Sequence, residues 1–164
     1  MILKPKHWKK SEEDERTMYY ETKSFLASKG YERYEISNYA KPGYECRHNL
    51  SYWDRVDYLG LGLGAASLLG NTRKSNQTEL SQYLKGNFEG EEETLSDNNA
   101  MEEYFFLGLR KMKGVDWTPY KIQYEKVVEK LITEGLLEEE EGRIRLTELG
   151  IDVSNYVLSE FLVE

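Results

Sequence analysis

Cysteine is almost absent from this sequence, which has one such residue, Cys46, among 164. A single thiol cannot close a disulfide within the chain, so a fold stapled by internal disulfides is excluded. Chains with so little cysteine are typical of a reducing compartment. We therefore expect a cytoplasmic protein.

Long apolar segments and concentrations of basic residues are also missing. No apolar run approaches the roughly 20 residues that span a bilayer, and residues 1–17 are too polar for a signal peptide. The chain has 30 acidic and 22 basic residues, a formal net charge of −8, and its basic residues cluster only in residues 4–10. Because a nucleic-acid-binding surface needs a concentrated basic footprint, we expect neither a membrane span nor a nucleic-acid partner.

The amino-terminal half alternates helical and strand patterns. Ser11 is a typical helix cap, and apolar residues at helical spacing follow it until Gly30, which predicts a helix. The next predicted elements are a strand over 31–37, a loop over 38–55, a glycine-rich strand over 56–69 and a helix over 77–84. This order is typical of an α/β layer architecture.

Residues 85–97 are polar, acidic and glycine-containing, which is typical of a linker. We place a domain boundary there, which gives domains 1–90 and 91–164. The second domain is predicted to contain a helix over 98–114, a helix from Thr118 to Gly135, a hairpin that turns at Gly142, and a last helix with Leu149, Val153, Val157 and Phe161 on one face. We expect a small, mostly helical, winged-helix-like domain that acts as a lid or interaction domain, because its helices are too acidic for DNA.

Only two convincing strands occur in the first ninety residues, and a two-stranded sheet is marginally stable by itself. The glycine-rich strand also has the composition of a strand buried on both faces, which requires neighbouring strands and covering helices. We therefore predict that residues 1–90 are the carboxyl-terminal portion of a larger α/β domain, a partial barrel. Functional loops would follow its strands, at residues 37–40 and 64–67.

Three segments resemble successive blocks of one protein family. They are YERYEISNYAKPGYECRHNLSYW (31–53), DYLGLGLGAASLLGNTRKSN (57–76) and LLEEEEGRIRLTELGIDVSNYVLSEFL (136–162). In this order they are similar to the oxygen-independent coproporphyrinogen III oxidase-like radical S-adenosylmethionine proteins, and within them to the HemW branch of heme chaperones. The resemblance covers nearly the whole chain.

The resemblance implies an amino-terminal radical domain, in which a CxxxCxxC motif holds a 4Fe-4S cluster, and a small carboxyl-terminal domain. This sequence has no such motif, and one thiol cannot supply the three ligands that the cluster needs. The chain therefore resembles only the carboxyl-terminal half of a family member, and we expect no radical chemistry from it alone. The amino-terminal half of the family is an implied partner.

The heme-associated motif of the chaperone branch, HNxxY, corresponds here to His48, Asn49 and Tyr52. Imidazole and phenolate are both axial ligands of heme iron, and Asn49 could orient the imidazole while Trp53 and Tyr44 cover a porphyrin face. The resemblance implies that these residues bind heme. The alternative from the residues alone is that His48 is a hydrogen-bonded structural histidine.

The family's later contacts to S-adenosylmethionine fall, by motif position, on Ala40 and Ala66. Small side chains beside a flat adenine or a methionine moiety leave room for packing and for backbone hydrogen bonds. The alternative is that these alanines are small because the ends of the strands are crowded, which explains the composition equally well. The assignment of Ala40 and Ala66 therefore depends on the resemblance.

Other residues near these motifs have weaker interpretations. Cys46 could bind iron as thiolate, but we interpret it as incidental, and His7 as a surface residue. Arg47 and Arg55 could meet porphyrin propionates or pair with Asp54 or Asp57. The run GLGLG does not have the spacing of the GxGxxG dinucleotide fingerprint.

Three functions remain as hypotheses. The first is the carboxyl-terminal part of a HemW-like protein that binds heme and transfers it to acceptor proteins. The second is part of an oxygen-independent coproporphyrinogen III oxidase, which would decarboxylate two propionate side chains. The third is an interaction module that has lost both sites. Whether the whole protein is an enzyme, and whether it associates peripherally with membranes, stays open.

Overall fold

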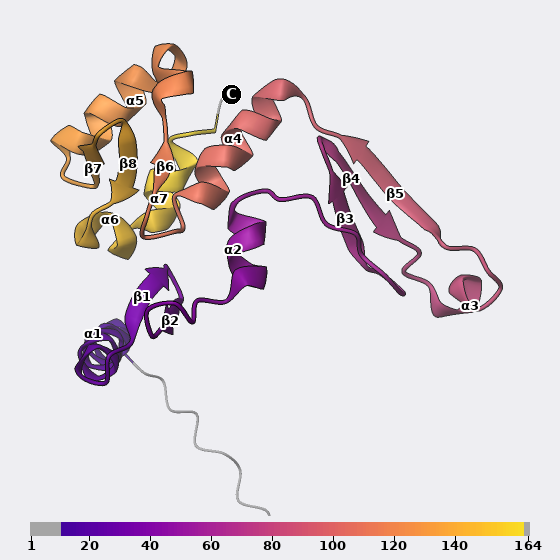
Figure 1. The fold of residues 1–164 in the computed structure, drawn as a ribbon, viewed down its shortest axis with the longest axis horizontal. Helices are drawn as coiled ribbons and strands as arrows, with labels where there is room; N and C mark the ends of the chain where they lie inside the picture. Colours follow the sequence, from indigo (N-terminus) through magenta and orange to yellow (C-terminus); the bar gives the residue numbers. More distant parts are fainter. Residues whose placement is uncertain (1–10, 163–164) are drawn as a thin grey trace, which may run out of the picture. The chain divides into compact units, whose positions relative to one another are not determined.

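The computed structural model describes residues 11–162, which belong to two compact units, Met1–Glu45 and Cys46–Glu164 (Figure 1). Each unit is described by itself. No helix within residues 11–162 is long and apolar enough to cross a bilayer. The chain has mixed α/β structure, as predicted, and every strand pair between residues 11 and 162 is antiparallel. No closed barrel occurs in that part of the chain.

The first unit consists of a helix and a hairpin: α1 (Glu12–Ser28), β1 (Glu32–Glu35) and β2 (Asn38–Ala40). Ser11 and Asp14 form a reciprocal capping box at the start of α1, and Gly30, with φ +76°, ends the helix as predicted. The predicted loop at 38–40 is wrong, because these residues pair with β1. The fully buried carboxylate of Glu35 holds the turn, since it accepts hydrogen bonds from the Ser37 backbone and the Asn38 side chain.

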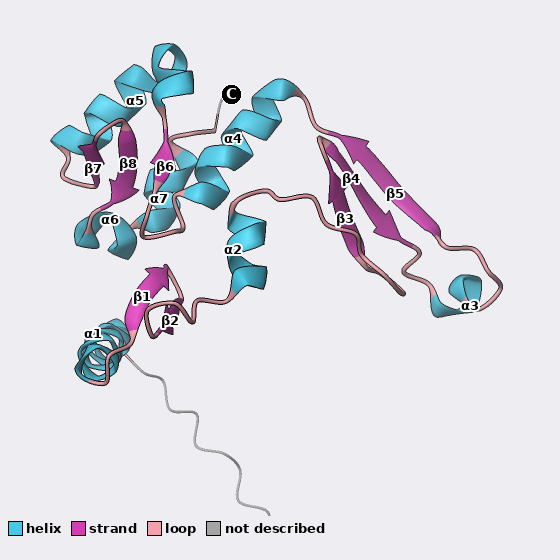
Figure 2. Cartoon of the chain, in the orientation of Figure 1, coloured by secondary structure: helices cyan, strands magenta, loops and turns pink. Residues whose placement is uncertain are grey.

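The second unit begins with α2 (Arg47–Trp53), followed by a three-stranded antiparallel sheet, β3 (Ala66–Leu69), β4 (Thr72–Asn76) and β5 (Glu89–Thr94), with α3 (Leu80–Tyr83) between β4 and β5 (Figure 2). The linker predicted over 85–97 is wrong, because β5 occupies its central residues, Glu89–Thr94. The acidic residues that suggested a linker lie opposite basic ones: Glu93 pairs with Arg73 and Glu92 with Lys74. The division into domains 1–90 and 91–164 stays a prediction.

The glycine-rich strand predicted over 56–69 is also mostly wrong. Residues 59–65 form a loop in which Gly62 and Gly64 have positive φ angles, and Leu59, Leu61 and Leu63 are exposed. Alternating Leu and Gly resembles strand periodicity, but glycine makes the left-handed turns of this loop accessible. Side chains secure the loop: Asn76 Nδ2 donates to the carbonyl of Gly62 at 2.8 Å, and Gly60 N–H donates to Ser67 Oγ at 2.9 Å.

Gly60 is required by a close backbone approach. A Cβ at this position would lie 2.2 Å from the carbonyl oxygen of Ala66. The Gly60→Ala variant is therefore expected to lose about 1–3 kcal/mol of unfolding free energy, as overpacking typically does. Leu61→Ala in the same loop, where the side chain is 83% exposed, should stay within roughly 0.5 kcal/mol of the unaltered chain. Urea unfolding followed by circular dichroism measures both, and equal losses would contradict this account of Gly60.

The remainder of the second unit contains α4 (Asp97–Gly108), β6 (Val115–Asp116), a 3₁₀ turn (Thr118–Tyr120), α5 (Lys121–Thr133), β7 (Leu137–Glu140), β8 (Arg143–Leu146), α6 (Glu148–Asp152) and α7 (Ser154–Ser159). The strands form a sheet in the order β6-β8-β7. Its hairpin turns at Glu141 and Gly142, both with positive φ, which is typical of a two-residue hairpin turn. The predicted hairpin and its turn are thus confirmed.

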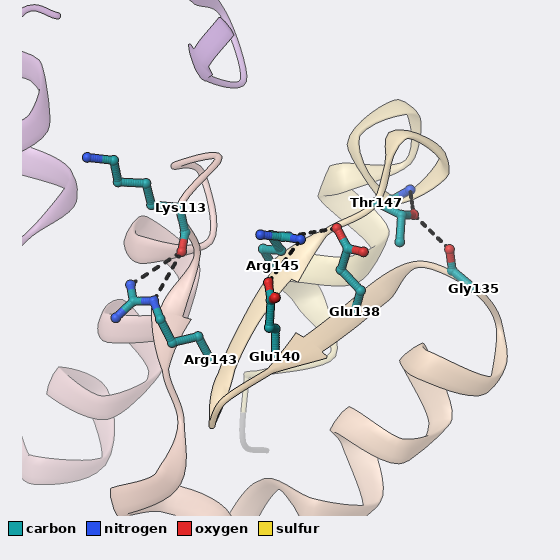
Figure 3. Close-up of polar contacts among 8 residues, drawn as sticks. Lys113, Gly135, Glu138, Glu140, Arg143, Arg145 and Thr147 are labelled. Carbon is teal, nitrogen blue, oxygen red and sulfur yellow. Dashed lines mark hydrogen bonds and ion pairs between the residues drawn. The ribbon is translucent and has the colours of Figure 1, made fainter. Parts of the chain in front are cut away.

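Charged pairs across the hairpin explain its acidic run (Figure 3). Arg145 on β8 pairs with Glu138 at 2.7 Å and with Glu140 at 3.4 Å. Arg143, two residues earlier on β8, does not join these pairs. Its guanidinium donates to the carbonyl of Lys113 at 3.3 Å. The exposed carboxylates therefore stabilise strand pairing, at modest strength because the pairs are solvated.

An aromatic cluster forms the centre of this core. Phe105 of α4 stacks on Phe161 with ring centroids 4.7 Å apart and contacts Tyr124 of α5 at 4.6 Å. Tyr124 Oη donates to the carbonyl of Phe161 at 3.2 Å, so its one polar group is satisfied. The helix predicted from Thr118 to Gly135 is confirmed as α5, which buries Tyr124, Val128 and Leu131 on one face.

Two predicted helix boundaries are wrong. The helix expected to reach residue 114 ends at Gly108, where the chain turns toward β6. The single last helix is broken at Val153, whose φ of −116° and ψ of 30° are not helical. Because of this break, Leu149 and Val153 are exposed while Val157 and Phe161 are buried.

Candidate functional site

The HNxxY motif lies on a helix, where the sequence had predicted a loop. The helix α2 begins after Cys46, whose side chain makes no capping hydrogen bond, and His48 and Tyr52 are one turn apart on the same face. Their rings meet edge to face with centroids 4.8 Å apart, and Tyr52 meets Tyr58 in the same manner at 4.7 Å. The result is a row of three rings, in which His48 is exposed and the two tyrosines are half-buried.

A cavity of about 350 Å³ lies next to this row of rings. Its lining is Asn49, Tyr52 and Trp53 of α2, Tyr58, Leu68 of β3, Arg73 of β4 and Leu107 of α4. Most of these side chains are apolar or aromatic, and the polar ones are few, as is usual for sites that bind small molecules. The volume is at the low end of the roughly 300–1,000 Å³ that such sites span. We call it the α2 cavity.

One wall of the α2 cavity is a row of side chains across the sheet. Tyr58 and Leu68 exchange backbone hydrogen bonds at 2.8 and 3.0 Å, and Leu68 pairs directly with Arg73. Residues directly opposite in antiparallel strands project from the same face. Tyr58, Leu68 and Arg73 therefore line the cavity together, although they belong to three different segments of the sheet.

Salt bridges fix the helices around the cavity. Glu103 of α4 accepts from Arg55 Nε at 2.9 Å and from Arg73 Nη2 at 2.8 Å. Asp54, at the end of α2, pairs with Lys111, and Asp57 accepts from the Gly70 backbone at 2.8 Å. The predicted pairing of Arg55 with Asp54 or Asp57 is therefore wrong.

The structure brings some predicted residues together and not others. Asn49 and Tyr52 line the α2 cavity, whereas His48 is outside the lining and contacts Tyr52. Cys46 and Arg47 are exposed at the start of α2, and His7 lies outside the described residues. Sequence reasoning missed Arg73 and Leu107, and the segment around Arg73, TRKSN, has no local pattern that marks it.

The two alanines predicted to contact S-adenosylmethionine lie in different units. Ala40, in the first unit, is buried at the end of β2 and lines a cavity of about 390 Å³ with Tyr31, Tyr39, Lys41 and Tyr44. Ala66, in the second unit, is exposed at the start of β3. Around Ala66 the backbone is closely packed, since Gly60 leaves no room for a side chain beside it.

A second cavity of the same unit, of about 500 Å³, lies at the first turn of α4, and Tyr104 is in its lining. Burial raises the pKa of Tyr104, and the neighbouring negative charge of Asp116 raises it further. The Thr118 side chain and backbone donate to Asp116 and lower the pKa of that carboxyl. Among residues 11–162, no three histidine, cysteine, aspartate or glutamate side chains are grouped so that they could hold a metal ion.

Comparisons with known proteins agree on a family. Residues 95–153 match the HemN C-terminal domain. The chain is 36% identical to the heme chaperone HemW of Lactococcus lactis over 94% of its own length and 44% of that protein. It is 34% identical to the heme chaperone HemW of Bacillus subtilis over 93% of the chain, and it spans 44% of that protein as well. The chain therefore spans less than half of the curated relatives that it matches.

The fold is also similar to a solved structure. The radical SAM enzyme coproporphyrinogen III oxidase (HemN) from Escherichia coli matches 94% of this chain and 42% of its own, with a TM-score of 0.72 and 21% identity. At this identity the likeness concerns the fold alone. The sequence matches together identify the chain as HemW-like, with a HemN C-terminal domain over residues 95–153.

Proposed function

We propose that this chain is the part of a HemW-like protein that binds heme, through the HNxxY motif on α2, for transfer to acceptor proteins. One observation carries the proposal: Asn49 and Tyr52 line the α2 cavity, and the exposed His48 packs edge to face against Tyr52 on the same helix. Aromatic and aliphatic walls suit the flat, apolar faces of a porphyrin. The names of the relatives, heme chaperone HemW, support the same assignment.

His48 is the axial ligand in this proposal, and Tyr52 is part of the wall. The two axial ligands of heme iron approach from opposite faces of the porphyrin, whereas His48 and Tyr52 project side by side from one helix face. One helix face can therefore fill only one axial position. The exposed His48 is accessible to iron, while Tyr52 is packed between His48 and Tyr58.

The volume of the α2 cavity limits what it can enclose. About 350 Å³ is small for a ligand as large as a tetrapyrrole, so the cavity would take an edge of the ring while the rest stays accessible. Partial exposure suits a carrier, because an acceptor must reach the heme to remove it. Shallow burial also favours rapid release.

The remaining assignments concern the whole protein. A 4Fe-4S cluster and S-adenosylmethionine would belong to it, with the cluster held by cysteines outside this sequence and S-adenosylmethionine contacted by Ala40 and Ala66. The cavity that Ala40 lines with three tyrosines would suit a flat ligand, and the amino-terminal radical domain would be the partner that completes the site. We retain the division into domains 1–90 and 91–164 and a cytoplasmic location as proposals. We also propose a winged-helix-like second domain, since the order α4-β6-α5-β7-β8 is that of such a domain.

The alternative function, oxygen-independent coproporphyrinogen III oxidation, has weaker support. It rests on the likeness to the Escherichia coli enzyme, which concerns the fold. The HNxxY motif and the names of the sequence relatives favour the chaperone. Turnover of coproporphyrinogen by the full-length protein would reverse this ranking.

Heme titration of the unaltered chain tests the proposal. Addition of ferric heme is expected to give a shifted Soret band that saturates at one heme per chain, because one helix face offers one axial histidine. The absorbance at the Soret maximum, measured against heme in buffer alone, gives the stoichiometry. A spectrum that remains that of free heme would contradict the proposed function.

A further inference from the structure

Arg73 is the one basic side chain in the lining of the α2 cavity. It lies on β4 directly opposite Leu68, and so projects from the same sheet face as Leu68 and Tyr58. Leu68 is buried and Tyr58 half-buried. The cavity thus has an aromatic and aliphatic wall with one cation, Arg73. Asn49 adds an amide side chain to the lining.

The guanidinium of Arg73 is held in place but retains free donors. Its Nη2 donates to Glu103 at 2.8 Å, and this is its one hydrogen bond with the described residues. A guanidinium has five N–H donors in a rigid fork, so Nε and Nη1 remain available, and the side chain is 41% exposed. A carboxylate could therefore be bound without breaking the pair with Glu103.

The charges beside Arg73 are balanced, but its donors are not all used. Glu103 is shared between Arg73 and Arg55. Glu93 lies opposite Arg73 on β5 and is exposed, and no ion pair joins these two side chains in the described structure. The remaining donors of Arg73 are therefore open to a ligand carboxylate.

We propose that Arg73 anchors a carboxylate of the ligand, so that the α2 cavity selects planar apolar molecules with a carboxylate at their edge. This inference rests on the proposed function, and it gives the substrate class: a tetrapyrrole whose propionate side chains are free acids. Arg73, rather than Arg47 or Arg55, is then the propionate contact. Arg47 is exposed on α2 outside the cavity lining, and the Nη2 atom of Arg55 is buried away from solvent.

Energetically, the contact is a charge-assisted hydrogen bond on a partly exposed guanidinium. Such bonds are stronger than neutral ones, and solvent screening reduces their effect at exposed sites. We expect the free acid to bind about tenfold more tightly than the corresponding diester, which corresponds to about 1.4 kcal/mol. The diester keeps the same iron and the same flat ring, so ligation by His48 is unchanged between the two ligands.

Two ligands and three variants test the inference. Ferric heme and ferric heme dimethyl ester are titrated into the unaltered chain, Arg73→Gln, Arg73→Lys and the control Arg145→Gln, with affinity read from the Soret band. Arg145 is a matched control because it also lies on a strand, pairs with a glutamate and has a side chain 43% exposed. Circular dichroism checks that each variant is folded, which we expect of Arg73→Gln because Glu103 keeps its bond with Arg55.

The expected pattern is specific. The unaltered chain and Arg145→Gln prefer the free acid about tenfold, Arg73→Gln binds both ligands equally and at the level of the ester, and Arg73→Lys retains part of the preference. If the unaltered chain binds acid and ester equally, or if Arg73→Gln keeps the preference, the inference is overturned while heme binding stands. If neither ligand binds the unaltered chain, the proposed function fails, and this inference fails with it.

Discussion

Replacement of His48 by alanine is expected to weaken the binding of ferric heme by a factor of about ten or more, equivalent to at least about 1.4 kcal/mol. The imidazole is exposed and contacts Tyr52, so its removal should not disturb the core. The change deletes the iron–nitrogen bond and leaves the cavity lining, Tyr52 and Tyr58 among it, intact. Residual affinity would then come from contacts between the porphyrin and these walls.

Cys46→Ala is the matched control for this variant. Cys46 lies two residues before His48, is exposed, and makes no capping hydrogen bond for α2. Its replacement should leave heme affinity and the Soret maximum unchanged. A large loss in Cys46→Ala together with normal binding by His48→Ala would assign the iron ligand to the thiolate and contradict the assignment to His48.

The largest effect on stability is expected from Phe105→Ala. Phe105 is fully buried and contacts Phe161 and Tyr124, both of them also in the core. Removing a buried phenylalanine side chain leaves a cavity and costs about 3–5 kcal/mol. We expect the free energy of unfolding, from urea denaturation followed by circular dichroism, to fall by about this amount.

The adjacent residue provides the control for that measurement. Phe106 follows Phe105 on α4, but its side chain is 39% exposed, because successive helical residues project about 100° apart. Phe106→Ala should change the free energy of unfolding by about 1 kcal/mol or less. If Phe105→Ala and Phe106→Ala lost similar amounts of unfolding free energy, the face of α4 that packs into the core would differ from the one described.

The parts of the fold that were predictable are those with local physical signals. The helix cap at Ser11, the helix end at Gly30 and the hairpin turn at Gly142 each specify backbone geometry through neighbouring atoms. The stripe on α5 likewise follows from helical periodicity. These elements were predicted correctly because no distant residue is needed to form them.

The errors arose where distant residues decide the structure. The acidic segment 89–94 forms a strand because β4 offers it basic partners, and a linker has the same composition. The alternating Leu and Gly of residues 59–65 form a loop that Asn76 and Ser67 secure. Sequence spacing could not assign the basic residues of β4 to the acidic segment, nor Asn76 and Ser67 to the loop.

The candidate site divides in the same way. The resemblance pointed to His48, Asn49 and Tyr52, which lie within five residues of one another on one helix. The residues that complete the cavity, Arg73 and Leu107, come from β4 and α4. Their contribution depends on strand register and on the salt bridges of Glu103, which no local pattern predicts.

The most direct test of the central claim is the electron paramagnetic resonance spectrum of ferric heme bound to the chain, compared with that of His48→Ala. Axial histidine gives the iron a ligand field different from that of water or thiolate, so the spectrum reports the ligand itself. We predict a histidine-ligated spectrum for the unaltered chain that is lost in His48→Ala and retained in Cys46→Ala. Identical spectra for the unaltered chain and His48→Ala would contradict the claim that α2 supplies the heme ligand.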